Sequence, residues 1–246
     1  MLLTRYGARE WIIATVVCVP LGVIAFLSSW WWLLAVAALI WIMVAGFFRD
    51  PLGRRPATAD TTDWVSPADG TISRVEILEH HEATEGPALL IRIFLSVLDV
   101  HLNRAPCDAS VREIVYRPGL WLDARTEESA RVNESNLVKL ESRDGLLLGV
   151  RQVSGAIARR IVCPLAPGDR VGRGERWGMI KFGSTTELIV PHPERSKPLV
   201  EVGDKVRGGI TILASVAGCI DGSTGGAGID QAASGPSPKP QSVPSS

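Results

Sequence analysis

The feature that most constrains this chain is a stretch without any charged residue over residues 11–48. A single membrane-spanning helix needs only about 20 apolar residues, and a secretory signal has a shorter apolar core that ends at a small-residue cleavage site. Two short helices at 11–27 and 31–48, joined by a turn at 28–30, fit the stretch better than either. The sequence therefore predicts a membrane helical hairpin over residues 1–48.

Basic residues flank both outer ends of this hairpin. They are Arg5, Arg9, Arg49, Arg54 and Arg55. Because Lys and Arg are enriched in cytoplasmic segments next to membrane helices, both ends of the hairpin are expected in the cytoplasm. The rest of the chain is then expected at the cell membrane, on its cytoplasmic side. A shallow hairpin that does not cross the bilayer stays open, because both helices are short and Pro20 interrupts the first.

The remaining sequence divides into a polar connector at 49–63, a β-rich domain at 64–218 and a tail at 219–246. Runs of apolar and β-branched residues recur in the domain, separated by Gly, Pro and Asp, which predicts strands. They cover residues 72–78, 89–95, 111–116, 146–153, 187–190 and 210–213. Residues 119–136 favour a loop, and residues 156–162 suit a short helix. The tail is rich in Gly, Ser, Pro and Ala, so we expect it to be disordered.

Two segments of the β-rich domain share the pattern Gly-Asp-x-Val-x-x-Gly, at residues 168–174 and 203–209. Gly allows a positive φ angle and Asp accepts hydrogen bonds from nearby backbone amides, so each pattern predicts a tight turn before a strand. The repeated turn resembles the hairpins of lipoyl- and biotinyl-type barrel-sandwich domains. The expected fold is therefore mainly β (α+β), a barrel-sandwich-like β domain behind the N-terminal helical hairpin.

The composition argues against two classes of function. Lys plus Arg and Asp plus Glu each number 26, so the chain lacks the basic excess of a nucleic-acid-binding protein. The four cysteines lie far apart without a Cys-x-x-Cys pair. His80 and His81 lie between Glu79 and Glu82, but this polar stretch favours a solvated loop, without further ligand residues nearby in sequence. We therefore expect neither a nucleic-acid partner nor a metal site.

Three short segments carry side chains that are candidates for catalysis. Asp69 lies in a turn before a predicted strand, His101 follows another strand, and Ser184 follows Gly183 inside an interrupted strand. A hydroxyl held beside the glycine carbonyl can attack it, since glycine has no Cβ to block the approach. Taken singly, each segment also has an ordinary structural interpretation: an Asx turn, a structural histidine and a β-bulge.

Taken together with Phe-Phe-Arg-Asp-Pro, these segments resemble the phosphatidylserine decarboxylases. The matching pieces occur in that family's order at residues 47–51, 66–70, 99–106 and 182–185, and the resemblance extends over about residues 47–214. It implies a proenzyme that cuts its own backbone between Gly183 and Ser184. The products would be a β chain of residues 1–183 and an α chain of residues 184–246, which stay together as a heterodimer.

The resemblance also implies the chemistry. Ser184 would become a covalent pyruvoyl group, the cofactor that accepts electrons while carbon dioxide leaves the substrate. Asp69 matches the aspartate tied to self-cleavage, and His101 matches the histidine tied to decarboxylation, as a proton donor. The expected reaction converts phosphatidylserine in the membrane to phosphatidylethanolamine and carbon dioxide, and it needs no metal.

One position departs from the pattern of the longer family members, which carry a second histidine three residues after the first. Here that residue is Arg104, whose guanidinium stays protonated and is a poor base. Either His101 serves both steps, or Asp69 acts with the strained turn alone. Arg104 is instead a candidate for binding the phosphate or carboxylate of the substrate, since it offers a planar fork of donors.

Two other functions stay open from the sequence. One is a membrane-tethered barrel-sandwich module that binds or carries a group without catalysis. Its modifiable lysine would lie at a hairpin tip, and no lysine here has the Met-Lys or Asp-Lys-Ala context of such a tip. The other is a pyruvoyl decarboxylase of a different amino-containing substrate, against which the apolar hairpin argues.

Overall fold

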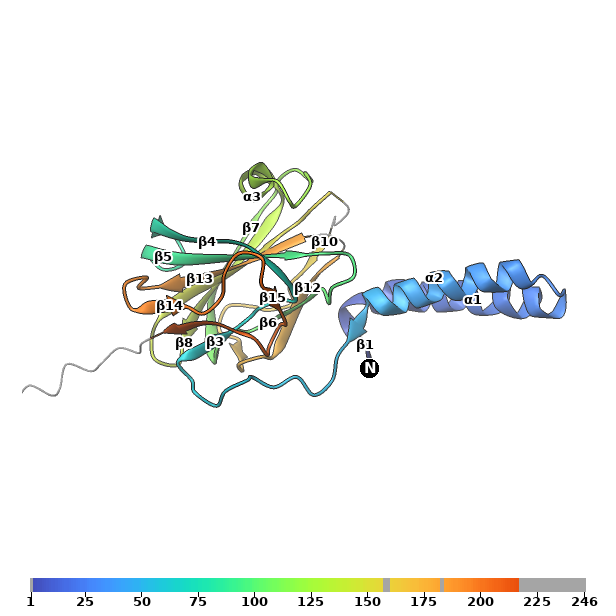
Figure 1. The fold of residues 1–246 in the computed structure, drawn as a ribbon, viewed down its shortest axis with the longest axis horizontal. Helices are drawn as coiled ribbons and strands as arrows, with labels where there is room; N and C mark the ends of the chain where they lie inside the picture. Colours follow the sequence, from blue (N-terminus) through green and yellow to red (C-terminus); the bar gives the residue numbers. More distant parts are fainter. Residues whose placement is uncertain (1, 157–159, 182–183, 217–246) are drawn as a thin grey trace, which may run out of the picture.

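A computed structural model describes residues 2–156, 160–181 and 184–216 of the chain. Two helices lie side by side and project from a β domain (Figure 1). Helix α1 spans Ala8–Leu27 after a single 3-10 turn, η1, at Arg5–Gly7, and helix α2 spans Trp31–Phe47. Ser29 makes the turn between them with a φ of 57°. The predicted helical hairpin is therefore confirmed, with helix ends close to those expected.

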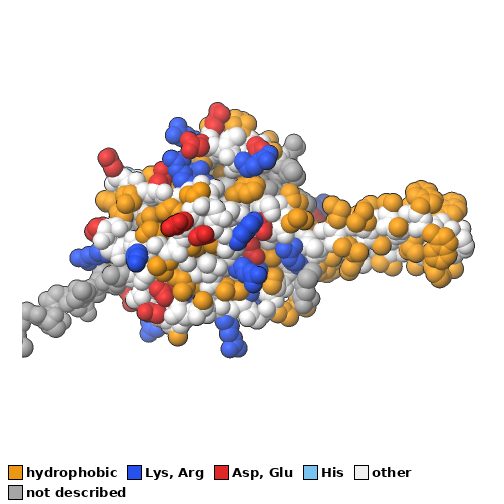
Figure 2. Space-filling model, in the orientation of Figure 1, with side chains coloured by type: hydrophobic (Ala, Val, Ile, Leu, Met, Phe, Trp, Pro, Cys, Tyr) orange, Lys and Arg blue, Asp and Glu red, His pale blue; other side chains and the backbone are white. Residues whose placement is uncertain are grey.

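The surface of this helical pair is apolar on nearly all sides. Figure 2 shows hydrophobic side chains along its length, and Trp30, Trp31 and Trp32 are exposed at its tip. Helix α1 with its preceding turn is long and apolar enough to cross a membrane, while α2 is apolar but shorter. A helix that is hydrophobic all round suits a protein core or a membrane. Because most side chains of this pair are exposed, its surface fits a lipid environment.

The β domain is built on one curled antiparallel sheet of eight strands. Its strand order is β11-β7-β8-β9-β13-β5-β4-β15. The strands are β4 (Gly70–His81), β5 (Gly86–Leu95), β7 (Ala109–Arg117), β8 (Ser135–Ser142), β9 (Leu147–Val153), β11 (Arg170–Val171), β13 (Ser184–Pro191) and β15 (Lys205–Val206). Strand β13 lies in the interior of the sheet, paired with β5 on one side and β9 on the other.

Three smaller sheets complete the fold. Strand β12 (Arg176–Lys181) pairs with β6 (Leu102–Arg104) and β10 (Arg160–Val162). Strand β16 (Ile212–Val216) pairs with β3 (Asp63–Val65) and β14 (Ser196–Pro198), and β1 (Leu2–Leu3) pairs with β2 (Arg49–Asp50). Strand β12 ends at Lys181 and β13 begins at Ser184, so the chain leaves one sheet and enters another across the predicted cleavage position.

The main hydrophobic core joins residues of the large sheet to residues of the smaller sheets. It includes Trp64, Ile91, Leu148, Trp177 and Leu213, all buried. On the large sheet, Leu188 and Val190 face this core, while Ile189 belongs to a separate cluster on the opposite face, as the two-residue period of a strand requires. The predicted mainly β fold with an N-terminal helical hairpin is confirmed.

Both Gly-Asp turns occur where the pattern predicts them. Gly168 and Gly203 have φ angles of 93° and 102°, a region that favours glycine. The Asp169 carboxylate accepts a hydrogen bond from the Ala166 amide, and the Asp204 carboxylate accepts one from the Glu201 amide. The strands that follow, β11 and β15, are the two edges of the large sheet.

Two local predictions were wrong. The segment 119–136, expected as a loop, contains helix α3 (Glu127–Val132), which begins where the Thr126 side chain accepts a hydrogen bond from the Ser129 amide. The segment 156–162, expected as a short helix, ends in strand β10, which pairs with β12; residues 157–159 lie outside the described residues. The expected disorder of residues 219–246 also falls outside the described chain and stays a prediction.

Candidate active site

Ser184 is the first residue of strand β13 and is completely buried. It lies opposite Leu95, the last residue of β5. Its Oγ has no hydrogen-bond partner among the described residues. A buried hydroxyl without a hydrogen-bond partner lowers the stability of the fold by about 1–3 kcal/mol. A fold that tolerates this cost fits a hydroxyl that is kept free for reaction. Gly183, on the other side of the predicted cleaved bond, lies outside the described residues.

His101 is also completely buried, in the connection from β5 to β6. Its Nδ1 lies 2.9 Å from the carbonyl oxygen of Asp99. Because a carbonyl only accepts hydrogen bonds, this contact assigns the proton to Nδ1 and leaves a lone pair on Nε2. Nε2 is buried and has no hydrogen-bond partner in the described part of the chain. It is therefore an available proton acceptor.

The electrostatic surroundings keep this imidazole neutral. Burial lowers the pKa of His101 to about 4, although the Asp99 carbonyl and the negative charges of Asp99 and Asp69 act in the opposite direction. At neutral pH the Nε2 lone pair is therefore present in nearly every molecule. A histidine in this state can take a proton from a hydroxyl, and it can give a proton only after it has taken one.

The backbone brings His101 and Ser184 to the same end of the domain. The amide of Ile180 in β12 donates to the His101 carbonyl at 3.1 Å, while Ser184 pairs with Leu95. The segment from Leu95 to His101 leads from β5 to β6, and their pairing partners β13 and β12 also follow each other in the chain. The two predicted residues lie on neighbouring crossings between the same pair of sheets.

Asp69 lies in the turn before β4, with its carboxylate fully engaged. The Arg54 guanidinium binds both carboxylate oxygens, and the Gly208 amide donates to Oδ1 at 2.8 Å. The turn packs directly against β5, since a Cβ on Gly70 would lie 2.2 Å from the Phe94 carbonyl oxygen. Both carboxylate oxygens therefore already accept hydrogen bonds from protein groups. The arrangement favours a positioning and electrostatic role for Asp69 over proton transfer.

Arg104, in strand β6, is buried and largely committed to protein partners. Its Nη1 donates to the Gly174 carbonyl at 2.8 Å, and its Nη2 lies 3.5 Å from the Asp50 carboxylate. Burial lowers the pKa of Arg104 to about 10, so the group remains charged at neutral pH. Asp50 also pairs with Arg176. Its two Nη atoms are therefore engaged by the protein, while its buried Nε has no hydrogen-bond partner among the described residues.

These pairs form a charge cluster, buried at Asp50, Asp69 and Arg104 and reaching the surface at Arg176, that the sequence reasoning missed. It consists of Asp50, Arg54, Asp69, Arg104 and Arg176. Three guanidinium groups face two carboxylates, which leaves one net positive charge beside the candidate site. Asp50 was visible as part of the Phe-Phe-Arg-Asp-Pro segment, whereas Arg54 was noted only as a basic residue that flanks the hairpin.

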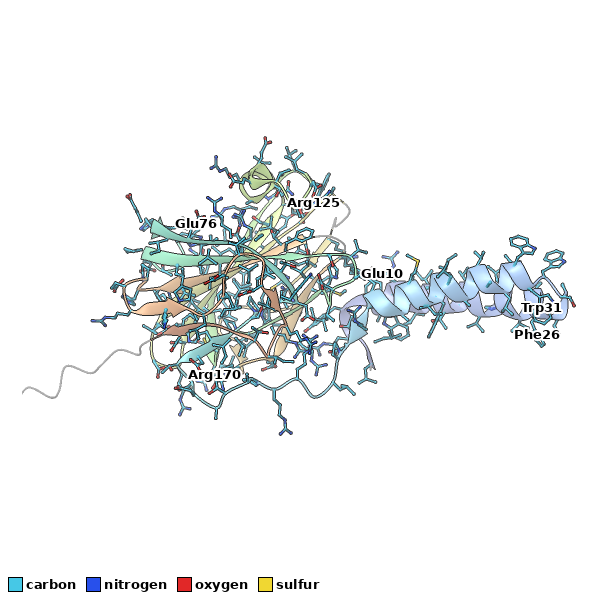
Figure 3. All side chains as sticks on the ribbon, viewed as in Figure 1. Glu10, Phe26, Trp31, Glu76, Arg125 and Arg170 are labelled. Atoms are coloured by element: carbon cyan, nitrogen blue, oxygen red, sulfur yellow. The ribbon has the colours of Figure 1, made fainter. Side chains whose placement is uncertain are left out.

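The foot of the helical pair, where Glu10, Phe47 and Phe48 meet the β domain, forms one wall of the site. The Phe47 ring lies against the imidazole of His101, and the Lys181 ammonium lies 5.9 Å from the centre of the Phe48 ring. Lys181 also binds the Glu10 carboxylate, 2.5 Å from Nζ to Oε1. Figure 3 shows Glu10 where helix α1 meets the β domain. Helix α1 is thereby joined to the end of β12, immediately before the predicted cleavage position.

A chain of hydrogen-bonded, buried side-chain amides connects the strands around the site. The Asn103 amide donates to Thr186 Oγ1 at 3.0 Å, and the Gln152 amide donates to Asn103 Oδ1 at 2.8 Å. The Asn136 amide donates to Gln152 Oε1 at 3.1 Å. The chain links strands β13, β6, β9 and β8, so it fixes β6, which follows His101, relative to β13, which begins at Ser184. In the described residues no group of three or more His, Cys, Asp or Glu side chains is placed to hold a metal ion.

Comparison with known sequences gives the arrangement a family. The sequence profile described as phosphatidylserine decarboxylase matches residues 41–214, which contain all the predicted site residues. This chain belongs to the phosphatidylserine decarboxylase family. The predicted resemblance is therefore confirmed from the end of α2 through the β domain as far as Ala214.

Individual relatives agree with this assignment. A phosphatidylserine decarboxylase proenzyme of Rhodopirellula baltica is 44% identical over 213 residues, which cover 85% of this chain and 86% of the relative. The proenzyme of Carboxydothermus hydrogenoformans is 40% identical, with 81% of this chain and 93% of the relative covered. That of Syntrophus aciditrophicus is 38% identical, with 82% and 93% covered. The similarity thus spans nearly the whole length of these relatives.

Proposed function

We propose that this chain is a self-cleaving phosphatidylserine decarboxylase, a carboxy-lyase that converts phosphatidylserine to phosphatidylethanolamine and carbon dioxide. Full-length similarity to proteins named as proenzymes of this activity supports the reaction. The observation that carries the proposal is the buried, unpartnered hydroxyl of Ser184 on one connection between two sheets, with the buried, neutral His101 on the neighbouring connection. Neither Ser184 Oγ nor His101 Nε2 is hydrogen-bonded to another described group, so neither has a competing hydrogen bond when self-cleavage brings them together.

Self-cleavage would use these two side chains in sequence. His101 Nε2 takes the proton of the Ser184 hydroxyl, and Oγ attacks the carbonyl carbon of Gly183. The amide bond breaks, its nitrogen gains a proton, and residues 183 and 184 become joined by an ester. In the elimination that follows, the Cα of residue 184 gives its proton to a base, the bond from Cβ to the ester oxygen breaks, and residues 1–183 are released with a free carboxylate. Hydrolysis of the new amino terminus consumes one water, releases ammonia and leaves the pyruvoyl group.

The residues around Ser184 fit such a group. Its keto function supplies an electron sink for the bond to the departing carboxylate. In each turnover His101 would take a proton from the ammonium group of the substrate and return it to the carbon that loses carbon dioxide. Asp69, held by Arg54, keeps a negative charge close enough to favour the protonated imidazole. Arg104 would act on the substrate phosphate or carboxylate through the net charge of the buried cluster, since its Nη atoms are already engaged.

The pairing of strands explains why the two products would stay together as a heterodimer. Strand β13 begins the α chain and pairs with β5 and β9, both of which belong to the β chain. Strands β15 and β16 of the α chain pair with β4 and β3. Cutting one bond therefore removes none of these ladders. The apolar helical pair would hold the assembly at the cell membrane, with the β domain on the cytoplasmic side and phospholipid substrate within reach.

Intact-mass spectrometry of the purified full chain in detergent tests the proposal. We expect two fragments that divide after Gly183, with the smaller lighter by one ammonia than a peptide that begins with serine. Release of labelled carbon dioxide from carboxyl-labelled phosphatidylserine, but not from free serine, would then identify the substrate. A single chain that stays intact during incubation with phosphatidylserine vesicles would contradict the proposal and favour the non-catalytic binding module.

A further inference from the structure

The loop at residues 96–101, between β5 and β6, carries two apolar side chains in an exposed position. Leu98 is 83% exposed and Val97 is 46% exposed. Among the large hydrophobic side chains of the described residues, Leu98 has the greatest exposed fraction. Single exposed apolar residues are common on protein surfaces, so the surroundings of this pair decide whether it has a role.

The loop is held in one shape by its own hydrogen bonds. The Asp99 carboxylate accepts from the Ser96 amide at 2.8 Å and from the Ser96 hydroxyl at 2.7 Å. The Asp99 amide donates back to the Ser96 carbonyl at 2.9 Å. Since four residues are closed into a turn, Val97 and Leu98 are presented at its tip without further ordering. A preformed tip loses little conformational entropy when it contacts a partner.

The tip of the 96–101 loop is hydrogen-bonded to a residue that follows the helical pair. Arg49, which follows α2, donates to the Leu98 carbonyl at 2.6 Å and to the Gly46 carbonyl at 2.7 Å. In Figure 1 the green connection after β5 lies beside the ends of α1 and α2 that meet the β domain. The apolar tip and the apolar helices therefore leave the domain on the same side.

The length of α1 sets the depth at which this tip would lie. Its 20 residues rise about 30 Å at 1.5 Å per residue, which matches the hydrocarbon thickness of a bilayer. With the tryptophans of the helical tip at one interface, the foot lies at the other interface, beside the lipid headgroups. Arg5 and Arg9 are exposed at this foot, where anionic headgroups attract basic side chains.

We infer that Val97 and Leu98 insert into the cytoplasmic face of the bilayer and form a second membrane contact of the β domain. This inference rests on the proposed membrane-bound decarboxylase. A single helical pair lets the whole molecule tilt relative to the bilayer, and a second contact beside it limits that tilt. The same loop holds the His101 ring through the Asp99 carbonyl. The contact thus turns the edge that carries His101 toward the headgroups.

Depth measurement with a spin label tests the insertion without any need for catalysis. The full chain would carry Leu98→Cys or Ile77→Cys, with its four native cysteines replaced by alanine. Ile77 is the matched control because it is 69% exposed on β4 and has no contact with the helical foot in any described interaction. The protein would be reconstituted into vesicles of phosphatidylcholine and phosphatidylglycerol, which are not substrates.

We expect a label at position 98 to collide more often with oxygen and less often with an aqueous nickel chelate than a label at position 77. Equal collision rates at the two positions would overturn the inference. Because this readout uses no substrate, it stands even where decarboxylation fails.

Activity provides a second, separable readout. Two values of kcat/KM are compared, one on phosphatidylserine in vesicles and one on a monomeric short-chain analogue. We expect Leu98→Asp to lower the ratio of the first to the second by roughly 10-fold, which is the scale of losing the burial of one leucine. Ile77→Asp should leave that ratio unchanged. An equal loss on both substrates would mean that Leu98 acts on the folded site, and this would overturn its membrane role. Absence of carbon dioxide release by the unaltered chain would instead refute the proposed function.

Discussion

The ring of Phe47 lies against the imidazole of His101, with the ring centroids 4.3 Å apart and the ring planes inclined by 38°. Phe47 is the last residue of the apolar helical pair, and His101 is the candidate proton acceptor. Phe48, Val100, Leu102 and Met179 join Phe47 in one buried cluster at this junction. The membrane-facing element and the candidate site therefore share a wall, and the helical pair contributes to the burial that keeps His101 neutral.

This burial predicts a pH dependence of stability. The pKa of His101 is about 4 in the folded chain and about 6.5 when unfolded. Between these values the unfolded chain binds a proton that the folded chain does not, so the free energy of unfolding falls as the pH is lowered from 6.5 to 4. The full loss is about 3 kcal/mol.

Thermal unfolding of detergent-solubilised Ser184→Ala protein, with and without His101→Gln, measures this effect. We expect the stability difference between the two proteins to change across the window from pH 6.5 to 4 and to be constant above it. His192→Gln, which removes an exposed imidazole, is the control. Parallel stability curves with and without His101 would contradict the prediction.

Replacement of Ser184 by alanine is expected to abolish processing and activity together. The variant has no Oγ to attack the Gly183 carbonyl, so one uncut chain and no carbon dioxide are expected by mass spectrometry and gas release. Ser154→Ala is the matched control, because Ser154 is equally buried and its Oγ also has no partner among the described residues. Processing in Ser184→Ala would disprove the role of this hydroxyl.

The pair of Asp69 and Arg54 predicts separable effects on stability and on cleavage. Asp69→Asn leaves the buried Arg54 without its counter-charge, which costs about 3–5 kcal/mol for a buried pair. The double variant Asp69→Asn with Arg54→Gln is expected to recover much of this stability, because neither charge is left alone.

Self-cleavage in the double variant then decides what Asp69 does. We expect it to stay slow, because the negative charge that favours the protonated His101 is still missing. Denaturant unfolding and a time course of fragment formation measure the two effects. Recovery of cleavage together with stability would reduce Asp69 to a structural residue. Glu141→Gln, at an exposed pair with Arg112, serves as the control for loss of an ion pair.

The sequence was most informative where function depends on short segments. Ser184, His101 and Asp69 each lie in such a segment, and the helical pair is visible from the absence of charge over residues 11–48. The Gly-Asp turns were predictable because their conformation depends on local backbone chemistry. Helix α3 was missed although Thr126 with Glu127 and Glu128 after it is a readable helix start.

The charge pairs could not be predicted in the same way. Glu10 and Lys181 are 171 positions apart, and Asp50 and Arg176 are 126 apart. A single sequence gives the residue types but not which distant partners meet, because that depends on how four sheets pack. The sharing of Asp50 between Arg104 and Arg176 follows from such distant contacts. The roles assigned from the segments alone therefore needed the tertiary contacts.

The link from Glu10 to Lys181 yields the last prediction, on how the membrane element affects processing. Lys181 is the final residue of β12, and it is held by Glu10 of α1 and by the ring of Phe48. Glu10→Gln keeps the size of the side chain but removes its charge, so the end of β12 is held less firmly. Self-cleavage depends on the position of the Ser184 hydroxyl relative to the preceding carbonyl, and displacements of about 1 Å cost roughly 100-fold in rate.

We therefore expect Glu10→Gln to slow fragment formation by about 10-fold or more while the final fragments and the turnover of processed enzyme change little. A time course of newly synthesised chain in detergent, followed by intact mass, measures the rate. Glu113→Gln, which removes the exposed partner of Lys139, is the control and should process at the normal rate. Normal processing in Glu10→Gln would show that the helical pair does not position the cleavage segment. A slow rate that Lys181→Met reproduces, without a further decrease when both changes are combined, would establish that the two residues act as one unit.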